Sequence, residues 1–300
     1  MMVSNEQFAV LMADVDRGLR EKAVAIPARP LHAVPLVAEA LGVTEEIPID
    51  RRDPVREITA KSLFSHIHRW YENNYGDRLK TRVGPGAIAL KIRGEAWKAN
   101  LPLVYGSVEL VADRNLATNA SSSGFQVAGP GGRPTHNVLA SIEGLPRQLA
   151  TLLTDSELRE IFDDYVFALG VLQEIRGKRM NDALIAAAFT DLDVAVEKLT
   201  SERPDYGLSR WSSLQFTEKV IKAELRVAGV KFPSNHNLSN LAKASADHKL
   251  FRLDKQVLAE IQCSAGVRYG EEPTTLSEAL SAHRSSIRAV VPITGCGQTV

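Results

Sequence analysis

The chain has 300 residues, and its 36 lysines and arginines are balanced by 36 aspartates and glutamates. With 44% hydrophobic and 24% charged residues, the composition excludes disordered and fibrous proteins. Zero net charge also excludes a protein that coats nucleic acid through an overall excess of positive charge. The cysteines, Cys263 and Cys296, are far apart and have no neighbouring histidine, so neither a disulfide framework nor a structural zinc site is expected.

The sequence also indicates the cellular location of the chain and its number of domains. The first ten residues lack a basic stretch followed by an apolar one, and nowhere do about 18 apolar residues run together. We therefore expect a cytoplasmic chain that makes no membrane contact. Because domains typically contain about 100 to 200 residues, the length favours two structural units over one.

Helical signals dominate the first eighty residues. Ser4 and Gln7 have the spacing of a capping box, and the apolar residues after them recur every three or four positions, which predicts an amphipathic helix. Prolines at 27, 30 and 35 are expected to interrupt the next stretch before a short helix that ends at Gly42. A third helix, capped by Asp53 ahead of Pro54, is expected to end near Gly76.

The apolar period then changes from helical to alternating. Ile88, Leu90 and Ile92 alternate with other residues and predict a strand, and residues 101–111 supply a second strand-favouring run. A strand pair or small sheet is therefore expected. Residues 115–137, rich in serine, asparagine, glycine and proline, predict a long surface loop.

The remainder of the chain is predicted to be helical. A capping box at Thr154 and Glu157 begins a helix that is expected to end near Gly177. Helical spacing then continues over residues 184–199, 211–228, 238–246, 253–264 and 276–291. We expect a mainly α protein with an α+β module over residues 1–177, a bundle of about five helices over residues 178–291, and a tail over residues 292–300.

Five short segments of the bundle occur in a characteristic order. They are DLDVA at 191–195, FTEKVIKAEL at 216–225, a joint containing Gly229, Pro233 and HNLSNL at 236–241, RYG at 268–270, and EAL at 278–280. In this order and spacing they resemble the HEPN domain, a nucleotide-binding helical bundle of prokaryotic nucleotidyltransferase partners and toxin systems. The first 177 residues resemble no family that we recognise.

The sequence differs from HEPN ribonucleases at one motif. HEPN ribonucleases carry an arginine and a histidine four to six residues apart, and paired motifs meet in a dimer. Between residues 178 and 300 no arginine precedes a histidine at that spacing. We therefore expect binding rather than catalysis. The alternative is a metal-independent ribonuclease toxin with a rearranged site, for which Arg268, His283 and Arg288 are the candidates.

Basic residues on the helix predicted over 211–228 are the first binding candidates. Gln215, Lys219, Lys222 and Arg226 are separated by four, three and four positions, so they share one stripe that could face nucleotide phosphates or RNA. A solvated stripe, supported by a Glu218–Lys222 pair, is the competing interpretation.

Three further residues are candidates for the same binding role. His236 precedes a helix start, where it can contact a ligand or serve as a structural hydrogen-bonding residue. Arg268 and Tyr269 can bind an anion or brace the last helix.

Other suggestive patterns do not reach the specificity of a motif. His66 and His68 are two positions apart, so on a helix they point to different sides and do not form a metal pair. The glycine-rich segment at 129–133 lacks the lysine and hydroxyl residue of a phosphate-binding loop. We expect no metal and no cofactor.

The leading hypothesis is a dimeric, non-catalytic protein that binds nucleotide or RNA. The resemblance implies a prokaryotic toxin–antitoxin, phage-defence or stress setting, with a nucleotidyltransferase or another protein as a further partner. A third hypothesis is a structural adaptor, in which the bundle dimerises and residues 1–177 hold a protein partner.

Overall fold

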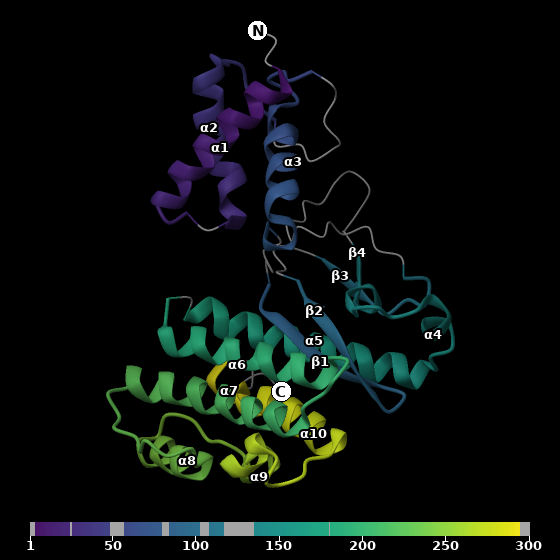
Figure 1. Cartoon of the computed structure of the whole chain (residues 1–300). Helices are drawn as coiled ribbons and strands as arrows, with labels where there is room; N and C mark the ends of the chain where they lie inside the picture. Colours follow the sequence, from purple (N-terminus) through teal and green to yellow (C-terminus); the bar gives the residue numbers. More distant parts are fainter. Residues whose placement is uncertain are drawn as a thin grey trace. The chain divides into compact units, whose positions relative to one another are not determined.

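The computed structural model describes residues 4–24, 26–48, 57–79, 84–102, 108–116, 135–179 and 181–294 (Figure 1). The chain divides into two compact units, Met1–Arg82 and Val83–Val300. The structure confirms the predicted class, because both units are mainly helical and the second also contains a two-stranded antiparallel sheet and a short parallel pair. Among the described residues, no helix combines the length and apolarity needed to cross a membrane.

The described residues of the first unit form three helices, α1 (Asn5–Glu21), α2 (Arg29–Leu41) and α3 (Leu63–Tyr75), with 3-10 turns at Ile26–Ala28 and Gly76–Leu79. The predicted capping box is confirmed, since the Ser4 hydroxyl accepts a hydrogen bond from the Gln7 amide. Gly42 and Gly76 end α2 and α3 as predicted. The apolar sides of the three helices meet around Met12, Val37 and Tyr71.

Two details of this unit differ from the prediction. Helix α2 is not interrupted by its prolines, because Pro30 lies in the first turn, where no amide donor is needed, and Pro35 is accommodated inside the helix. Helix α3 begins at Leu63, later than predicted, because the Ser62 hydroxyl closes a turn with Glu57 and Thr59 instead. The predicted Asp53 cap lies outside the described residues.

A buried ion pair joins the helices of the first unit. The Arg29 guanidinium lies 3.2 Å from the Asp16 carboxylate and also donates to the Val24 carbonyl at 2.9 Å. The Tyr75 hydroxyl donates to the same carboxylate, and Arg20 approaches it from the solvent side at 3.3 Å. Because Asp16 and Arg29 are both buried, removing either side chain would leave the charge of the other buried without its partner.

A β-hairpin begins the second unit. Strand β1 (Gly86–Ile92) pairs antiparallel with β2 (Glu95–Leu101), with Gly86 opposite Leu101 and Ile92 opposite Glu95. The first strand is as predicted, but its partner is not the run at 101–111. Arg93 and Gly94 both have positive φ, so a two-residue turn sends the chain straight back. Part of the predicted second run, β3 (Glu109–Val111), instead pairs in parallel with β4 (Thr135–Asn137).

The helices of the second unit follow the predicted order. After a 3-10 turn at Val138–Ser141, they are α4 (Arg147–Thr151), α5 (Asp155–Lys178), α6 (Ala183–Thr200), α7 (Tyr206–Val227), α8 (Leu238–Asp247), α9 (Lys255–Ile261), the 3-10 turn η4 (Ala265–Tyr269), α10 (Leu276–Ala289) and α11 (Val291–Thr294). The capping box at Thr154 is confirmed. Of the predicted surface loop, residues 117–134 lie outside the described residues.

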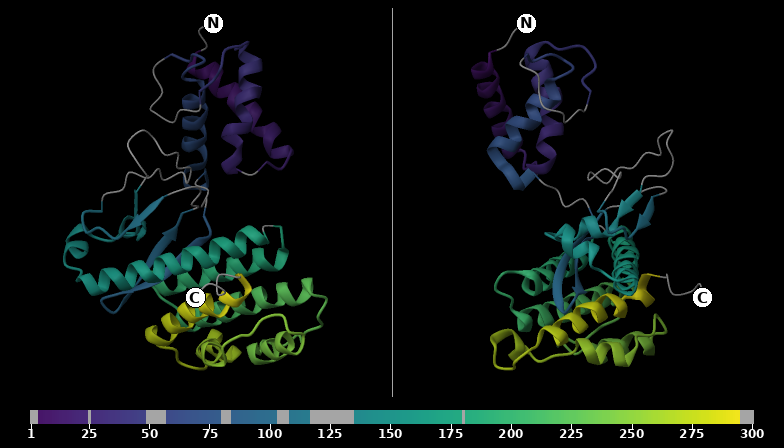
Figure 2. Two further views of the ribbon diagram at one scale, coloured as in Figure 1. Left: turned by 180° about the vertical axis from the view of Figure 1, so that it is seen from behind. Right: turned by 90° about the vertical axis from the view of Figure 1, so that its right-hand side faces the viewer.

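One hydrophobic core crosses the boundary that we predicted at residue 177. Strand β1 contacts α5, α6 and α10, and the further views show the hairpin lying against these helices (Figure 2). Apolar residues from Ile88 in the hairpin to Val290 near the end of the chain belong to the same buried cluster. The hairpin and α5 are therefore part of the helical unit, because each would otherwise expose an apolar side to water.

The start of α7 requires a glycine for packing. A Cβ atom on Gly207 would lie 2.1 Å from the Val267 carbonyl oxygen of η4. Gly207 thus lies inside the first helical turn, where it permits close contact between two backbones, rather than marking a bend before the helix.

Candidate functional site

Helix α7 lies at the centre of the bundle, and its sequence carries two apolar rows, which are covered on two sides. Leu214, Ile221 and Leu225 pack against α8 and α9, whereas Phe216 and Val220 join the main core. The remaining side carries the predicted basic stripe. This side of α7 and the loop before α8 together form a surface that we call the polar edge. Its residues are Gln215, Glu218, Lys219, Lys222, Arg226 and His236.

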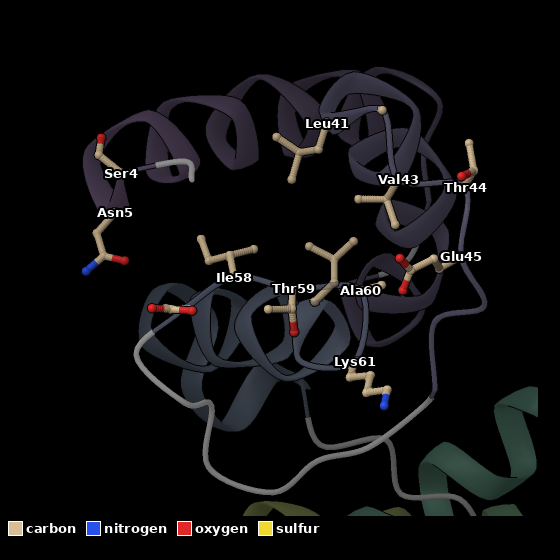
Figure 3. A pocket seen from close by; sticks show the side chains of 13 residues that line it. Ser4, Asn5, Leu41, Val43, Thr44, Glu45, Ile58, Thr59, Ala60 and Lys61 are labelled. Atoms are coloured by element: carbon tan, nitrogen blue, oxygen red, sulfur yellow. The ribbon is translucent and has the colours of Figure 1, made fainter. Parts of the chain in front are cut away.

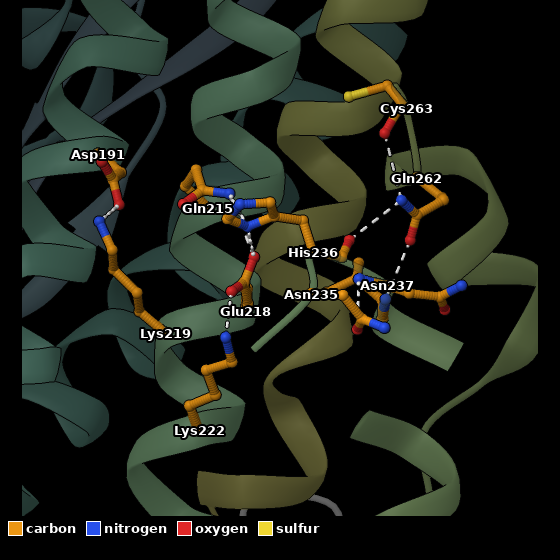
Figure 4. Close-up of polar contacts among 11 residues, drawn as sticks. Asp191, Gln215, Glu218, Lys219, Lys222, Asn235, His236, Asn237, Gln262 and Cys263 are labelled. Carbon is orange, nitrogen blue, oxygen red and sulfur yellow. Dashed lines mark hydrogen bonds and ion pairs between the residues drawn. The ribbon is translucent and has the colours of Figure 1, made fainter. Parts of the chain in front are cut away.

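Glu218 is the centre of this polar edge (Figure 4). Its side chain is only 4% exposed, and its carboxylate accepts hydrogen bonds from Lys222 Nζ and, at 2.8 Å, from His236 Nδ1. Gln215 Nε2 lies 3.1 Å from the same carboxylate. A buried carboxylate with three donors is held in one position.

The other basic residues of the edge also have acidic partners. Lys219 pairs with Asp191 of α6, and Arg226 pairs with Asp182 at 2.6 Å. Burial raises the pKa of Asp191, although the Lys219 ammonium opposes this effect. The cations of the stripe are therefore paired: Lys222 with Glu218 of the same helix, and Lys219 and Arg226 with Asp191 in α6 and Asp182 at its start.

His236 presents a half-exposed ring beside this cluster. Its side chain is 52% exposed, and its ring contacts Trp211 edge-on with centroids 5.1 Å apart. Gln262 fixes the backbone behind it, donating to the His236 carbonyl and accepting from the Leu238 amide at 3.0 Å (Figure 4). Asn237 caps α8. The ring is thus positioned from two sides before any ligand arrives.

Arg268 and Tyr269 do not join the polar edge. Both lie on η4, where the Arg268 guanidinium stacks over the Tyr269 ring at 4.9 Å from its centroid. Tyr269 is 65% exposed. Within the described chain no hydrogen bond connects this pair to the basic residues of α7, so the two predicted binding groups form separate surfaces.

The three candidates for a rearranged ribonuclease site are not brought together. His283 is completely buried in α10, and its Nε2 accepts a hydrogen bond from the Ala89 amide at 3.0 Å. Burial lowers the pKa of His283 to about 4. Arg288 is exposed on the same helix and lines the same cleft as His283, but Arg268 is not among the residues that line it.

The second unit also contains a cluster of three hydrogen-bonded side chains that the sequence did not predict. His136 Nε2 lies 2.8 Å from the Ser141 hydroxyl, and Tyr165 of α5 bonds to the same hydroxyl at 3.0 Å. Burial lowers the pKa of His136. Among the described residues no carboxylate orients the second ring nitrogen, so the group has only part of a nucleophile–base arrangement. No spacing in the sequence could indicate it, because Tyr165 reaches the other two residues only through the fold.

The first unit contains an open pocket of about 1090 Å³ (Figure 3). It is bordered by the start of α1, the end of α2 and the segment before α3, and its charged lining residues are Glu45, Glu57 and Lys61. These charges are few and mixed, so the pocket has no evident ligand chemistry.

In the part of the chain that the structure describes, no three histidine, cysteine, aspartate or glutamate side chains gather to hold a metal ion. His66 instead contacts Phe8, and His68 lies 3.5 Å from Glu72. Comparison of the chain with protein-family models finds no match, and comparisons with curated proteins and with solved structures find none either.

Proposed function

We propose that the second unit binds a mononucleotide at the polar edge of α7, as a cytoplasmic and non-catalytic protein. The observation that carries this proposal is the stripe of Lys219, Lys222 and Arg226 along α7, together with the half-exposed ring of His236, which bonds to Glu218 of the same helix. Ammonium and guanidinium groups suit a phosphate, whereas an aromatic ring and an amide suit a base.

The charge balance of the edge favours a small nucleotide over a long RNA. Each cation already has a carboxylate partner, so the edge as a whole is close to neutral. Long RNA gains affinity by contacting many phosphates with surplus positive charge, which is missing here. A mononucleotide needs only one or two cations to exchange a carboxylate for a phosphate, and Arg226, at 50% exposure, is the most accessible of them.

The resemblance to HEPN domains supports the same proposal and adds two features. It implies a homodimer, and it implies a setting in prokaryotic toxin–antitoxin or phage-defence systems with a nucleotidyltransferase or another protein as partner. Sedimentation velocity of the full chain tests the first feature directly: a single species with the mass of a monomer at micromolar concentration would contradict it.

A titration of the full chain with fluorescently labelled ADP tests the site. Replacing Lys219 alone would leave Asp191 unpaired, so the informative variant is Lys219→Gln with Asp191→Asn, which removes the pair without a net change of charge. Adding Arg226→Gln removes the accessible cation. We expect each step to weaken binding about tenfold, the effect of one lost charge-assisted hydrogen bond.

Arg203→Gln is the matched control, since Arg203 is exposed and its side chain makes no ion pair within the described chain. Its affinity should equal that of the wild type. Unchanged affinity in the triple variant would refute the site, and absence of binding by the wild type would refute the function.

The ribonuclease alternative has no such support, because His283 is buried. Incubation of the full chain with transfer RNA in EDTA should leave the RNA intact. Cleavage that disappears in His283→Ala would favour the alternative instead.

A further inference from the structure

A second, smaller cleft lies in the second unit, between β1, α5 and α10, away from the polar edge of α7. Its volume is about 330 Å³, at the lower end of the range for small-molecule sites. Apolar side chains from all three elements line it, among them Ile88, Leu280 and Ile287. Phe167 of α5 is 39% exposed and also lines the cleft, so an aromatic face is available to a ligand.

The acidic groups of this cleft are already engaged. Asp164 lies 2.5 Å from Arg284, which also approaches Glu160 at 3.9 Å. Glu260 accepts hydrogen bonds from the hydroxyls of Ser281 and Ser285. Asp164 and Glu160 thus share Arg284 as their cation partner, whereas Glu260 bonds only to hydroxyl groups.

Two basic residues of the cleft have no such partner. Lys91, near the end of β1, and Arg288, on α10, are exposed, and neither side chain makes a hydrogen bond or an ion pair with any residue that the structure describes. Arg288 lies near enough to Asp164 to favour its ionised form, but Asp164 bonds to Arg284. The charges that line the cleft balance, but two of its cations, Lys91 and Arg288, have no carboxylate in direct contact.

A buried donor in the wall of the cleft points to the same ligand chemistry. Because His283 Nε2 accepts from the Ala89 amide, the neutral ring carries its proton on Nδ1. Nδ1 is buried and has no hydrogen-bond partner among the described residues. An unsatisfied buried donor of this kind destabilises the folded chain, and a ligand oxygen that reached it would remove that penalty.

We propose that this cleft binds a small organic anion with a flat apolar body, an aromatic carboxylate. The carboxylate lies between Lys91 and Arg288, and the ring packs against Phe167, Leu280 and Ile287. This site is independent of the nucleotide site proposed on α7, since the two share no residue.

Calorimetric titration of the full chain with 2-naphthoate tests the proposal. Two related probes separate the contributions: 2-naphthamide keeps the ring but lacks the charge, and acetate keeps the charge but lacks the ring. We expect 2-naphthoate to bind at millimolar concentration or below, 2-naphthamide to bind at least about tenfold more weakly, and acetate to show no binding.

Arg288→Gln should weaken binding of 2-naphthoate about tenfold, and addition of Lys91→Gln should weaken it further. Both residues are exposed, so neither substitution endangers folding. The control is again Arg203→Gln, which should bind like the wild type. Equal affinity for 2-naphthoate and 2-naphthamide, unchanged affinity in the double variant, or no binding by the wild type would each overturn the proposal.

Discussion

The buried histidine of α10 makes the stability of the second unit depend on pH. His283 is fully buried, and burial rather than a charged neighbour lowers the pKa of its imidazole to about 4. In the unfolded chain the same group titrates near its ordinary value of about 6.5. Between these two values the unfolded chain binds a proton that the folded chain does not, so stability falls as the pH falls.

The magnitude follows from the difference between the two pKa values. A shift of one pKa unit corresponds to about 1.4 kcal/mol, so the full loss between pH 6.5 and pH 4 is about 3 kcal/mol. At pH 5 about 2 kcal/mol of it should already be lost. His283→Gln removes this dependence, because the glutamine amide does not titrate, while its oxygen can accept the hydrogen bond from Ala89.

Urea denaturation at pH 7.5 and pH 5.0 measures the effect. A Trp70→Phe background confines the tryptophan signal to the second unit, since the two other tryptophans, Trp97 and Trp211, both lie there. Other groups titrate in wild type and variant alike, so their difference isolates His283. The wild type should lose about 2 kcal/mol more than His283→Gln on acidification. Equal losses would refute the assignment of a neutral, buried imidazole.

Three further predictions concern stability, and urea denaturation measures the first two. Gly207→Ala should cost at least about 2 kcal/mol, because its Cβ would overlap a backbone carbonyl, whereas Gly177→Ala, at a helical glycine with open space around its Cβ, should be neutral or slightly stabilising. Glu218→Gln should cost about 3 kcal/mol by leaving Lys222 largely buried without its carboxylate, and adding Lys222→Met should restore at least half of the loss. Arg29→Met should destabilise the first unit by about 3 kcal/mol, which hydrogen exchange of α1 would report. Losses below 0.5 kcal/mol in any of the three destabilised single variants would contradict the corresponding contact.

Local signals predicted most of the helices correctly. The capping boxes at Ser4 and Thr154 and the glycine ends at Gly42 and Gly76 all occur where the sequence indicates them. These features are local because a cap joins residues three positions apart, and an amphipathic period is set by the helix itself. The same is true of strand β1, whose alternation is visible within seven residues.

The pairing of charges was only half predictable. Helical spacing placed Glu218 and Lys222 together, and the structure confirms that pair. The spacing gave no indication that Lys219 would pair with Asp191 or Arg226 with Asp182, because those carboxylates lie in α6 and at its start. The burial of His283 was equally invisible, since it depends on contact with a strand 194 positions earlier.

The sequence by itself determined the secondary structure class, the positions of the main helices and the two-sided burial of α7, all of which follow from spacing along one segment. Only the tertiary structure decided which strand pairs with β1 and that one core extends across residue 177. It also decided that the basic stripe would be neutralised and that Lys91 and Arg288 would share a cleft with His283. These outcomes depend on contacts between distant segments, which form only when the apolar sides of several elements are buried together.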